Sequence, residues 1–278
     1  MKYIGILLFA LVFLGSCKKE VPKEWVYQKT LTLDGVNPIG IANVDNVIWL
    51  SDGDHNRLVQ LDKDGTIEVT IDSLDRPMHI DGHNGLVYVP QYGNDMVELI
   101  YINTNGFDRK EFIIKNDSLD APSSISVLND EQAITDFYNN RILYRNEKGW
   151  ISFGSIGSSK GRFYYPTDVQ ITDSYIWVAD AYNNRIQVFD KEGNFVKMMG
   201  QNEKMNAATG LFVSKNEVFI TDFENNRVLI FDHEGQLKQE LKKGIKKATD
   251  LLVKDNILHI INYRTGELVL YDLQDIKV

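Results

Sequence analysis

Three polar residues occupy equivalent positions in three repeated segments of the chain, and their types could support chemistry. His79, Asp168 and Asp250 each stand near the start of an apolar, β-branched run. A histidine close to carboxylates can exchange a proton with a bound molecule or hold a polar group of it. We therefore predict that these residues contribute to ligand binding. The alternatives are that they form the catalytic site of a lyase or hydrolase, or that the carboxylates only cap loops.

Aromatic residues at the turns of four of the six repeats form a second candidate set. In chain order the turn positions carry Gly53, Tyr92, Phe137, Ala181, Phe223 and Tyr263, and the positions beside them carry Asp54, Gly93, Tyr138, Tyr182, Glu224 and Arg264. Aromatic rings with nearby polar groups suit a glycan or an extended peptide, by stacking and hydrogen bonding. We expect Tyr92, Phe137, Phe223 and Tyr263 to contact such a ligand. The alternative is that these rings only pack the ends of the repeats.

An aspartate and an arginine five positions apart recur at the corners of four repeats. The pairs are Asp52 with Arg57, Asp136 with Arg141, Asp180 with Arg185, and Asp222 with Arg227. The other two repeats have lost both partners together, because they carry Gln91 with Met96 and Asn262 with Glu267. A buried charge without its partner is costly, whereas the loss of both partners can be nearly neutral. Joint loss therefore predicts structural ion pairs rather than catalytic residues.

The repeat has the length of a propeller blade. Positions equivalent to Arg57 recur at steps of 39, 45, 44, 42 and 40 residues, the range that propeller blades occupy. Alternating and β-branched runs between Asn-Asn and Gly turns are typical of strands joined by hairpins. We predict an all-β propeller of six four-stranded blades. The sixth unit has only three strands, so we expect Glu24 to Leu33 to supply the fourth and close the ring.

The best-formed unit runs from Tyr165 to Gly200 and reads YPTDVQITDSYIWVADAYNNRIQVFDKEGNFVKMMG. It resembles an NHL repeat, with its Pro, hydrophobic strand, Asp, Asn-Arg and Asp-x-x-Gly in register, and weaker copies cover residues 37–272. The resemblance implies a six-bladed propeller of NHL-like blades. It is specific for fold and weak for function, because NHL-type propellers include binding modules, sensors and a few lyases.

The resemblance to NHL-type propellers also bears on whether this protein binds a metal ion. The peptidyl-hydroxyglycine lyases of this fold class place a zinc ion on three histidines near the axis. One face of a propeller carries the loops that enter each blade and the turns between the second and third strands, and we call it the loop face. Here only His55 and His79 are expected to face the axis on the loop face. His83 and His233 are expected to lie toward the opposite face. His259 stands in a column of aromatic residues and is expected to replace one in the core. We therefore expect no metal and no cofactor.

The first residues are predicted to form an export signal rather than part of the fold, the alternative being an uncleaved signal anchor with an incidental cysteine. MKYIGILLFALVFLGSC combines Lys2, an apolar run too short to span a bilayer, and a small-residue cleavage site directly before Cys17. This pattern resembles the lipobox of bacterial lipoproteins, and with the repeats it resembles the six-bladed propeller lipoproteins of Bacteroidetes-type bacteria. The resemblance implies a signal peptide at 1–16, acylation of Cys17, a tether at 17–23 and the propeller at 24–278.

Composition limits the partners. The 278 residues are 43% hydrophobic and 25% charged, with a formal net charge of −9. This charge argues against a nucleic-acid partner, which needs a basic face. Cys17 is the single cysteine, so the exported domain has no disulfide. We expect a monomer, lipid-anchored in the bacterial cell envelope with the outer membrane favoured. Its loop face would bind or scaffold a glycan, a peptide or an envelope protein.

Overall fold

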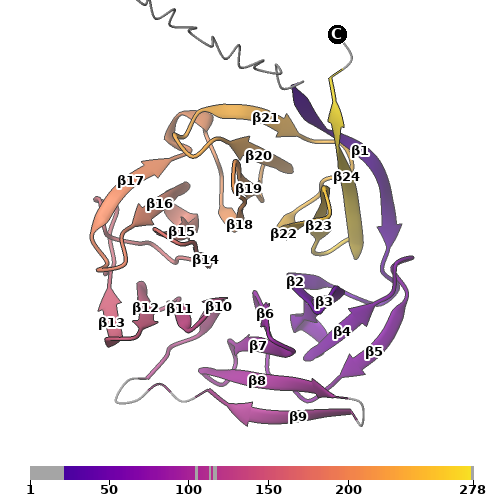
Figure 1. The fold of residues 1–278 in the computed structure, drawn as a ribbon, viewed down its shortest axis with the longest axis horizontal. Coiled ribbons are helices and arrows are strands. Elements are labelled where there is room, and N and C mark those ends of the chain that lie inside the picture. The colour runs from indigo at the N-terminus through magenta and orange to yellow at the C-terminus, as the bar shows by residue number, and fades with distance from the viewer. Residues whose placement is uncertain (1–21, 104–105, 113, 115–117, 277–278) are drawn as a thin grey trace, which may run out of the picture.

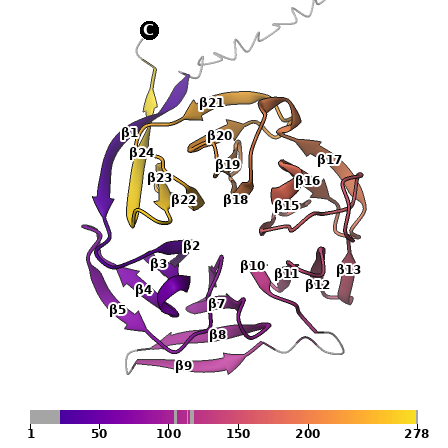
Figure 2. The ribbon, with the colours of Figure 1, turned by 180° about the vertical axis from the view of Figure 1, so that it is seen from behind.

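The computed structural model describes residues 22–276, except 104–105, 113 and 115–117. These residues form six four-stranded antiparallel sheets that are arranged as blades around a central axis (Figure 1). Figure 2 shows the ring from the other end, again with one strand of each blade innermost. The predicted all-β, six-bladed propeller is confirmed.

Blades 1 to 3 come from the first half of the chain, and each runs from an innermost to an outermost strand. Blade 1 consists of β2 (Pro38–Val44), β3 (Val47–Asp52), β4 (Arg57–Leu61) and β5 (Ile67–Ile71), with the short 3-10 helix η1 (Gly53–His55). Blade 2 consists of β6 (Asp81–His83), β7 (Leu86–Gln91), β8 (Met96–Asn103) and β9 (Gly106–Glu111). Blade 3 consists of β10 (Pro122–Leu128), β11 (Glu131–Asp136), β12 (Arg141–Asn146) and β13 (Gly149–Phe153).

Blades 4 to 6 complete the ring. Blade 4 consists of β14 (Asp168–Ile171), β15 (Ile176–Asp180), β16 (Arg185–Phe189) and β17 (Phe195–Met199), with η2 (Ala181–Asn183). Blade 5 follows η3 (Gln201–Glu203) and consists of β18 (Ala208–Val213), β19 (Val218–Asp222), β20 (Arg227–Phe231) and β21 (Leu237–Leu241). Blade 6 consists of β22 (Ala248–Lys254), β23 (Ile257–Asn262), β24 (Glu267–Asp275) and β1 (Lys23–Thr32).

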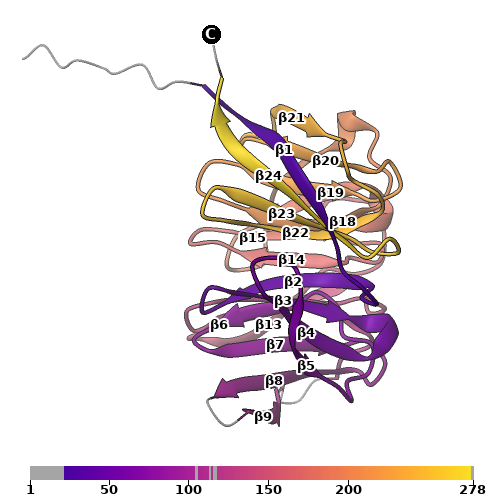
Figure 3. The same cartoon turned by 90° about the vertical axis from the view of Figure 1, so that its right-hand side faces the viewer.

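Blade 6 joins the two ends of the described chain. Strand β1 pairs with β24 in antiparallel register, with Trp25 opposite Leu273 and Leu31 opposite Leu268. Figure 3 shows β1 running beside β24 along the side of the ring. The buried ring of Trp25 meets Phe219 of blade 5 edge-on, with the ring centres 5.4 Å apart. The prediction that an N-terminal strand completes the last blade is confirmed.

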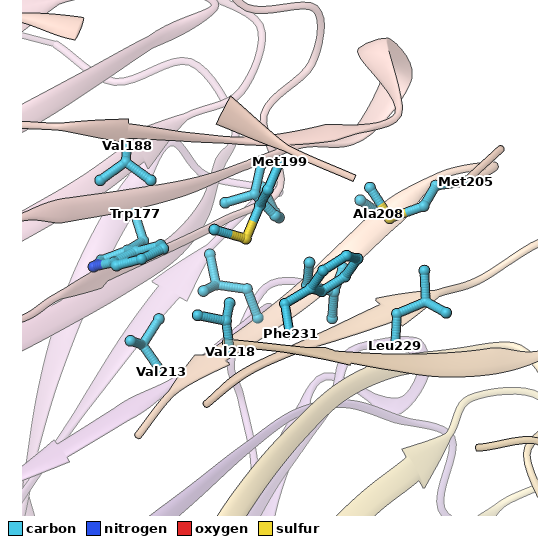
Figure 4. Close-up of a cluster of buried hydrophobic side chains, with 13 residues drawn as sticks. Trp177, Val188, Met199, Met205, Ala208, Val213, Val218, Leu229 and Phe231 are labelled. Atoms are coloured by element: carbon cyan, nitrogen blue, oxygen red, sulfur yellow. The ribbon is translucent and has the colours of Figure 1, made fainter. Parts of the chain in front are cut away.

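The hydrophobic core lies between neighbouring blades. Side chains alternate along each strand, so a sheet can present apolar groups to the blades on both of its sides. Figure 4 shows the cluster between blades 4 and 5, where Trp177 and Val188 pack with Val218 and Phe231. All four side chains are at most 1% exposed. Full burial of side chains of this size contributes roughly 1.5–3 kcal/mol each, which fixes the blades relative to one another.

The repeated aspartate and arginine secure the loop that enters their own blade. Asp180 is fully buried, and it accepts the backbone N–H of Tyr164, 16 residues earlier, at 2.8 Å. Arg185 donates from Nε to Asp180 at 2.8 Å, and from its Nη groups to the carbonyl oxygens of Ser158 and Ser159. The other three predicted pairs have Nε–Oδ2 distances of 2.9 Å (Arg57–Asp52), 2.6 Å (Arg141–Asp136) and 2.6 Å (Arg227–Asp222).

Blade 2 keeps the same loop contact with different residues. Gln91 accepts the backbone N–H of Asp75 at 2.6 Å and donates its amide to Glu98 at 2.6 Å. Glu98 in turn pairs with Arg109, whose guanidinium also bonds the carbonyl oxygen of Ser73 at 3.0 Å. The charge pair is therefore displaced by one strand, which corrects the expectation that this blade had lost it.

Blade 6 holds its entering loop through an amide. Asn262 accepts the backbone N–H of Lys246 at 2.9 Å and donates to the carbonyl oxygen of Gly244 at 2.8 Å. The same amide donates to Glu267 at 2.9 Å, and Lys246 pairs with that carboxylate at 3.0 Å. In each of the six blades, a buried side-chain oxygen at this corner therefore accepts a loop N–H.

The predicted signal peptide at 1–16 and the lipidation site Cys17 lie outside the described residues, as does most of the tether at 17–23. In the part of the chain that the structure describes, no helix is long and apolar enough to cross a membrane.

Candidate functional site

The innermost strand of each blade is the edge of its sheet, so part of its backbone finds no partner within that sheet. Side chains of an adjacent blade accept these backbone N–H groups. The acceptors and their donors are Asp81 with Val127, Ser126 with Ile171, Asp168 with Leu211, Gln170 with Val213, and Asp250 with Ile41. These contacts tie the inner strands together and fix the polar side chains around the axis.

His79, Asp168 and Asp250 converge at the axis from blades 2, 4 and 6. Nδ1 of His79 lies 3.4 Å from Oδ2 of Asp250 and 3.9 Å from Oδ2 of Asp168. The three side chains can each offer one ligand atom within 4.8 Å of the others. All three residues are buried, with 4 to 6% of their surface exposed. The structure thus brings together the three polar candidates that the sequence identified, and we call them the axial group.

Small residues at the equivalent positions of the intervening blades make room for the axial group. These positions are Gly40, Ser124 and Gly210. A Cβ atom added at Gly40 would lie 2.5 Å from the carbonyl oxygen of Met78, and one at Gly210 would lie 2.4 Å from that of Thr249. Both distances are far below a van der Waals contact, so the inner strands approach this closely only because these residues are glycines.

Burial and mutual charge shift the protonation of the axial group. Burial acts to lower the pKa of His79, but the carboxylates of Asp250 and Asp168 raise it above its ordinary value. Burial raises the pKa of Asp168 to about 6, while the charge of His79 opposes the shift. Burial likewise raises the pKa of Asp81 to about 7, against the backbone N–H groups that it accepts. The pKa values of the Asp168 and Asp81 carboxyl groups therefore lie much closer to neutral pH than those of ordinary aspartates.

A cavity of about 290 Å³ adjoins the axial group. Residues of all six inner strands line it, including the polar Asn43, Asp81, Ser126 and Gln170. This volume lies just below the usual range for small-molecule pockets. It suits an ion with its water molecules or a small polar group rather than a large ligand.

Two of the four other histidines that were assigned positions from the sequence are His55 and His259. His55 was expected to face the axis, but it is exposed and lies outside the lining of the axial cavity, with Nδ1 2.8 Å from Asp52. That expectation is wrong because η1 turns the side chain back to the corner of its own blade. His259 lies in the sheet between Leu252 and Leu270, and burial lowers its pKa.

A continuous group of aromatic rings covers the loop ends of blades 2, 3 and 4. This aromatic patch consists of Tyr92, Phe137, Tyr138, Tyr164, Tyr165 and Tyr182. Phe137 stacks on Tyr165 with the ring centres 4.9 Å apart and the planes inclined by 19°. Tyr165 meets Tyr182 at 5.2 Å, and Tyr92 meets Tyr138 at 5.7 Å. The contacts therefore run without a break across three blades.

Half of the aromatic patch is open to solvent. Tyr138, Tyr164 and Tyr182 are 48%, 40% and 60% exposed. Tyr92 is partly buried and donates its hydroxyl to that of Tyr138 at 2.5 Å, and Arg76 covers its ring at 4.8 Å. Contiguous exposed apolar surface on a folded protein commonly marks a contact site.

The aromatic patch includes two of the four predicted aromatic residues and leaves out the other two. Phe223 lies in blade 5, with Nζ of Lys247 5.2 Å from its ring centre. Tyr263 lies in blade 6 and donates its hydroxyl to Asp54 at 2.9 Å. Among the described residues, neither ring contacts another aromatic ring. The aromatic residues that the sequence grouped at the turns therefore do not lie together: two belong to a one-sided patch, and the other two lie among charged residues on the other side.

Sequence reasoning missed Tyr164 and Tyr165, which lie in the loop entering blade 4. It compared the turns between the second and third strands, but the entering loops reach the same end of the propeller because the first two strands are antiparallel. The backbone N–H of Tyr182 indeed donates to the carbonyl oxygen of Tyr164 at 3.2 Å. The available signal was the aromatic run before Pro166, in the letters FYYP.

Comparison with known proteins identifies the fold but no family. No protein-family model matches the sequence, and no curated protein matches it. A gluconolactonase from Xanthomonas campestris superposes with a TM-score of 0.72 at 15% identity, over 88% of this chain and 89% of that one. Virginiamycin B lyase from Staphylococcus aureus gives 0.64 at 15% identity, over 91% and 100%. BamB from Moraxella catarrhalis gives 0.57 at 10% identity, over 92% and 99%.

Identities this low show a shared fold alone. The similar structures include a lyase and a gluconolactonase, so the propeller does not by itself select one activity. Function must therefore be argued from the axial group and the aromatic patch.

Proposed function

We propose that this protein is a binding module of the bacterial cell envelope that holds a glycan, a peptide or a segment of an envelope protein on its aromatic patch. The observation that carries the proposal is the exposure of Tyr138, Tyr164 and Tyr182 within one continuous set of ring contacts. Rings that served only to pack the blade ends would be covered, and these are 40% exposed or more.

The chemistry of the aromatic patch favours a ligand with flat faces and polar edges. Tyrosine combines a broad apolar ring with a hydroxyl that can donate or accept a hydrogen bond. Sugar rings and the side chains of an extended peptide both offer faces for stacking and groups for those hydrogen bonds. Arg76, over the ring of Tyr92, places a positive charge at one side of the patch and would favour a ligand with an acidic group there.

The proposal includes a lipid anchor on Cys17. It is supported by the sequence LGSC at the end of the apolar run. Several acyl chains hold a protein at a membrane far more firmly than one. We predict that wild-type cells incorporate a labelled fatty acid into this protein, and that Cys17→Ala abolishes the label and releases the protein from the membrane fraction or leaves it unprocessed. Labelling of the variant at the wild-type level would contradict the anchor.

A lyase or hydrolase acting at the axis is the second candidate function. One observation favours it: His79 and Asp168 adjoin a cavity, and burial raises the pKa of Asp168 to about 6, a value suited to proton transfer near neutral pH. Turnover of a lactone, an ester or a cyclic peptide that disappears in His79→Ala, but persists when the aromatic patch is altered, would favour this candidate over binding.

The binding proposal is tested by presenting the detergent-solubilised full-length protein to arrays of glycans and peptides. We expect a discrete set of ligands that the Tyr138→Ala/Tyr182→Ala double variant no longer retains. Retention of the same ligands by the double variant would place the binding site elsewhere on the molecule.

A further inference from the structure

We infer that the axial group is a binding site for a divalent cation, with Nδ1 of His79 and Oδ2 of Asp168 and Asp250 as ligands and Zn²⁺ as the best-matched ion. This inference is independent of the binding role proposed for the aromatic patch. It departs from the expectation from sequence that the propeller holds no metal.

The first argument is that His79 lacks the partner that a buried polar atom normally has. Its Nδ1 is buried and forms no hydrogen bond of ordinary length and angle, because its nearest acceptor, Oδ2 of Asp250, lies at a long 3.4 Å. Most buried polar atoms in folded proteins are hydrogen-bonded, and one without a partner is costly. Nδ1 also faces Asp168 at 3.9 Å. A cation placed between this nitrogen and the two carboxylates would satisfy all three groups at once.

The second argument is that each carboxylate keeps binding capacity toward His79. Oδ2 of Asp250 accepts one N–H, from Ile41 at 3.0 Å, and Oδ2 of Asp168 accepts one, from Leu211 at 2.7 Å. Each carboxylate oxygen has two lone pairs, so one remains on each of these atoms. The N–H groups also hold the carboxylates in place, as partners outside the first coordination sphere do in known metal sites.

The third argument is geometric. Ligands about 2.0–2.2 Å from a tetrahedral zinc ion lie roughly 3.3–3.6 Å apart. The distances from His79 Nδ1 to the two carboxylate oxygens are 3.4 Å and 3.9 Å, and each of the three side chains offers a ligand atom within 4.8 Å of the others. A contraction of a few tenths of an ångström would bring the longer of the two His79 distances into this range, and the two carboxylates would close on the ion from at most 4.8 Å apart. The glycines at positions 40 and 210 allow the inner strands to stand this close to the axis.

The nature of the ligands selects the ion. One imidazole nitrogen with two carboxylate oxygens suits Zn²⁺ and other transition metals better than Ca²⁺ or Mg²⁺, which prefer more oxygen ligands. Three protein ligands leave at least one position for water or a bound molecule, and the adjoining cavity of about 290 Å³ has room for it. Two carboxylates would balance the charge of a divalent ion.

The test is a zinc titration of the full-length protein in detergent, after chelation has removed all metal. We expect one Zn²⁺ per chain and a rise in melting temperature on binding. Affinity should fall at least about 100-fold in His79→Ala, since the loss of an outer-shell partner alone typically costs 10–100-fold. His55→Ala is the matched control, because His55 also lies beside a carboxylate but is exposed, and it should bind zinc like the wild type.

A second measurement does not depend on the folding of any variant. Co²⁺ added to the stripped wild-type protein should give the visible absorption of a four-coordinate ion, together with a strongly shifted imidazole proton resonance in the NMR spectrum. Zinc binding that is absent, or unchanged in a folded His79→Ala protein, would overturn the inference. It would also be overturned if His79 is held between the carboxylates as an imidazolium ion, because zinc would then leave the melting temperature unchanged.

Discussion

His259 illustrates how one side chain can take over a structural position and bring a new property with it. The equivalent positions of four other blades carry Trp49, Tyr88, Trp177 and Phe219. His259 is partly buried between Leu252 and Leu270, and its Nδ1–H donates to the carbonyl oxygen of Ile257 at 3.2 Å. The imidazole thus fills the place of an aromatic ring, but unlike that ring it can gain a proton.

We predict that His259 makes the free energy of unfolding depend on pH below neutrality. Burial lowers its pKa in the folded protein, and Lys254 adds to the shift, whereas the unfolded chain titrates near 6.5. The unfolded state therefore binds more protons, so this contribution to stability is complete above pH 6.5 and is lost as pH falls through that value. His259→Phe should remove it.

The comparison with His259→Phe isolates this effect from opposing ones. Asp81 and Asp168, with pKa values raised to about 7 and about 6, protonate in the same range with the opposite sign. Urea unfolding of wild type and variant at several pH values between 5 and 8 gives the difference directly. The gain in stability of the variant relative to wild type should grow as pH falls, and a difference that stays constant would refute the assignment.

At the scale of an element, the corner of each blade holds the loop that positions the functional residues. Arg185 connects Asp180 to three carbonyl oxygens of the loop entering blade 4, those of Ser158, Ser159 and Arg162. This loop continues into two tyrosines of the aromatic patch. The corners therefore set the shape of the loop end that carries the aromatic patch.

We predict that Arg185→Met destabilises the fold by about 3–5 kcal/mol, because it leaves the buried carboxylate of Asp180 unpaired. The double variant Asp180→Asn/Arg185→Met should lose less than Arg185→Met alone, since no buried charge is then left without its partner. Blade 6 already works with an amide, Asn262, at this corner. Urea midpoints of the two variants decide the matter, and equal losses would contradict a structural ion pair.

The residues at the blade corners show which features of a blade can be predicted from sequence and which cannot. The strands, the period and the closing N-terminal strand follow from alternation and turn residues, which are local properties. The displaced pair in blade 2 does not, because Arg109 reaches Glu98 across two strands whose register depends on the fold. Comparison of the equivalent corner positions therefore shows that blade 2 lacks the aspartate–arginine pair, but it does not show that Glu98 and Arg109 replace that pair.

At the scale of the molecule, the axial group shows both what a sequence can predict and what it cannot. His79, Asp168 and Asp250 could be grouped from sequence because the blade repeat places equivalent positions around one axis. Their distances, and the unpartnered Nδ1 of His79, depend on how closely the inner strands approach and were not predictable. Of the six rings in the aromatic patch, two were predicted to contact a ligand and two more stood in the neighbouring turn column. Tyr164 and Tyr165 were missed because they come from an entering loop, which neither turn column includes.

The loop end of the whole propeller is asymmetric, and this asymmetry gives the sharpest expectation about the proposed binding function. Aromatic rings occupy the loop ends of blades 2 to 4, whereas Asp54, Glu224 and Lys247 are charged residues in the same loops of the remaining blades. A ligand held by stacking should therefore depend on the aromatic half and be little affected by Phe223 on the other side.

The most direct test is calorimetric titration of a ligand from the arrays into wild-type protein and single alanine variants. Tyr138→Ala and Tyr182→Ala should each weaken binding by roughly 1–3 kcal/mol, with melting temperatures close to wild type because both rings are exposed. Tyr101→Ala is the matched control, since Tyr101 is 49% exposed and lies outside the aromatic patch, in β8; it should bind normally. Wild-type affinity in both patch variants, or an equal loss in the Tyr101 control, would contradict the assignment of the aromatic patch as the binding site.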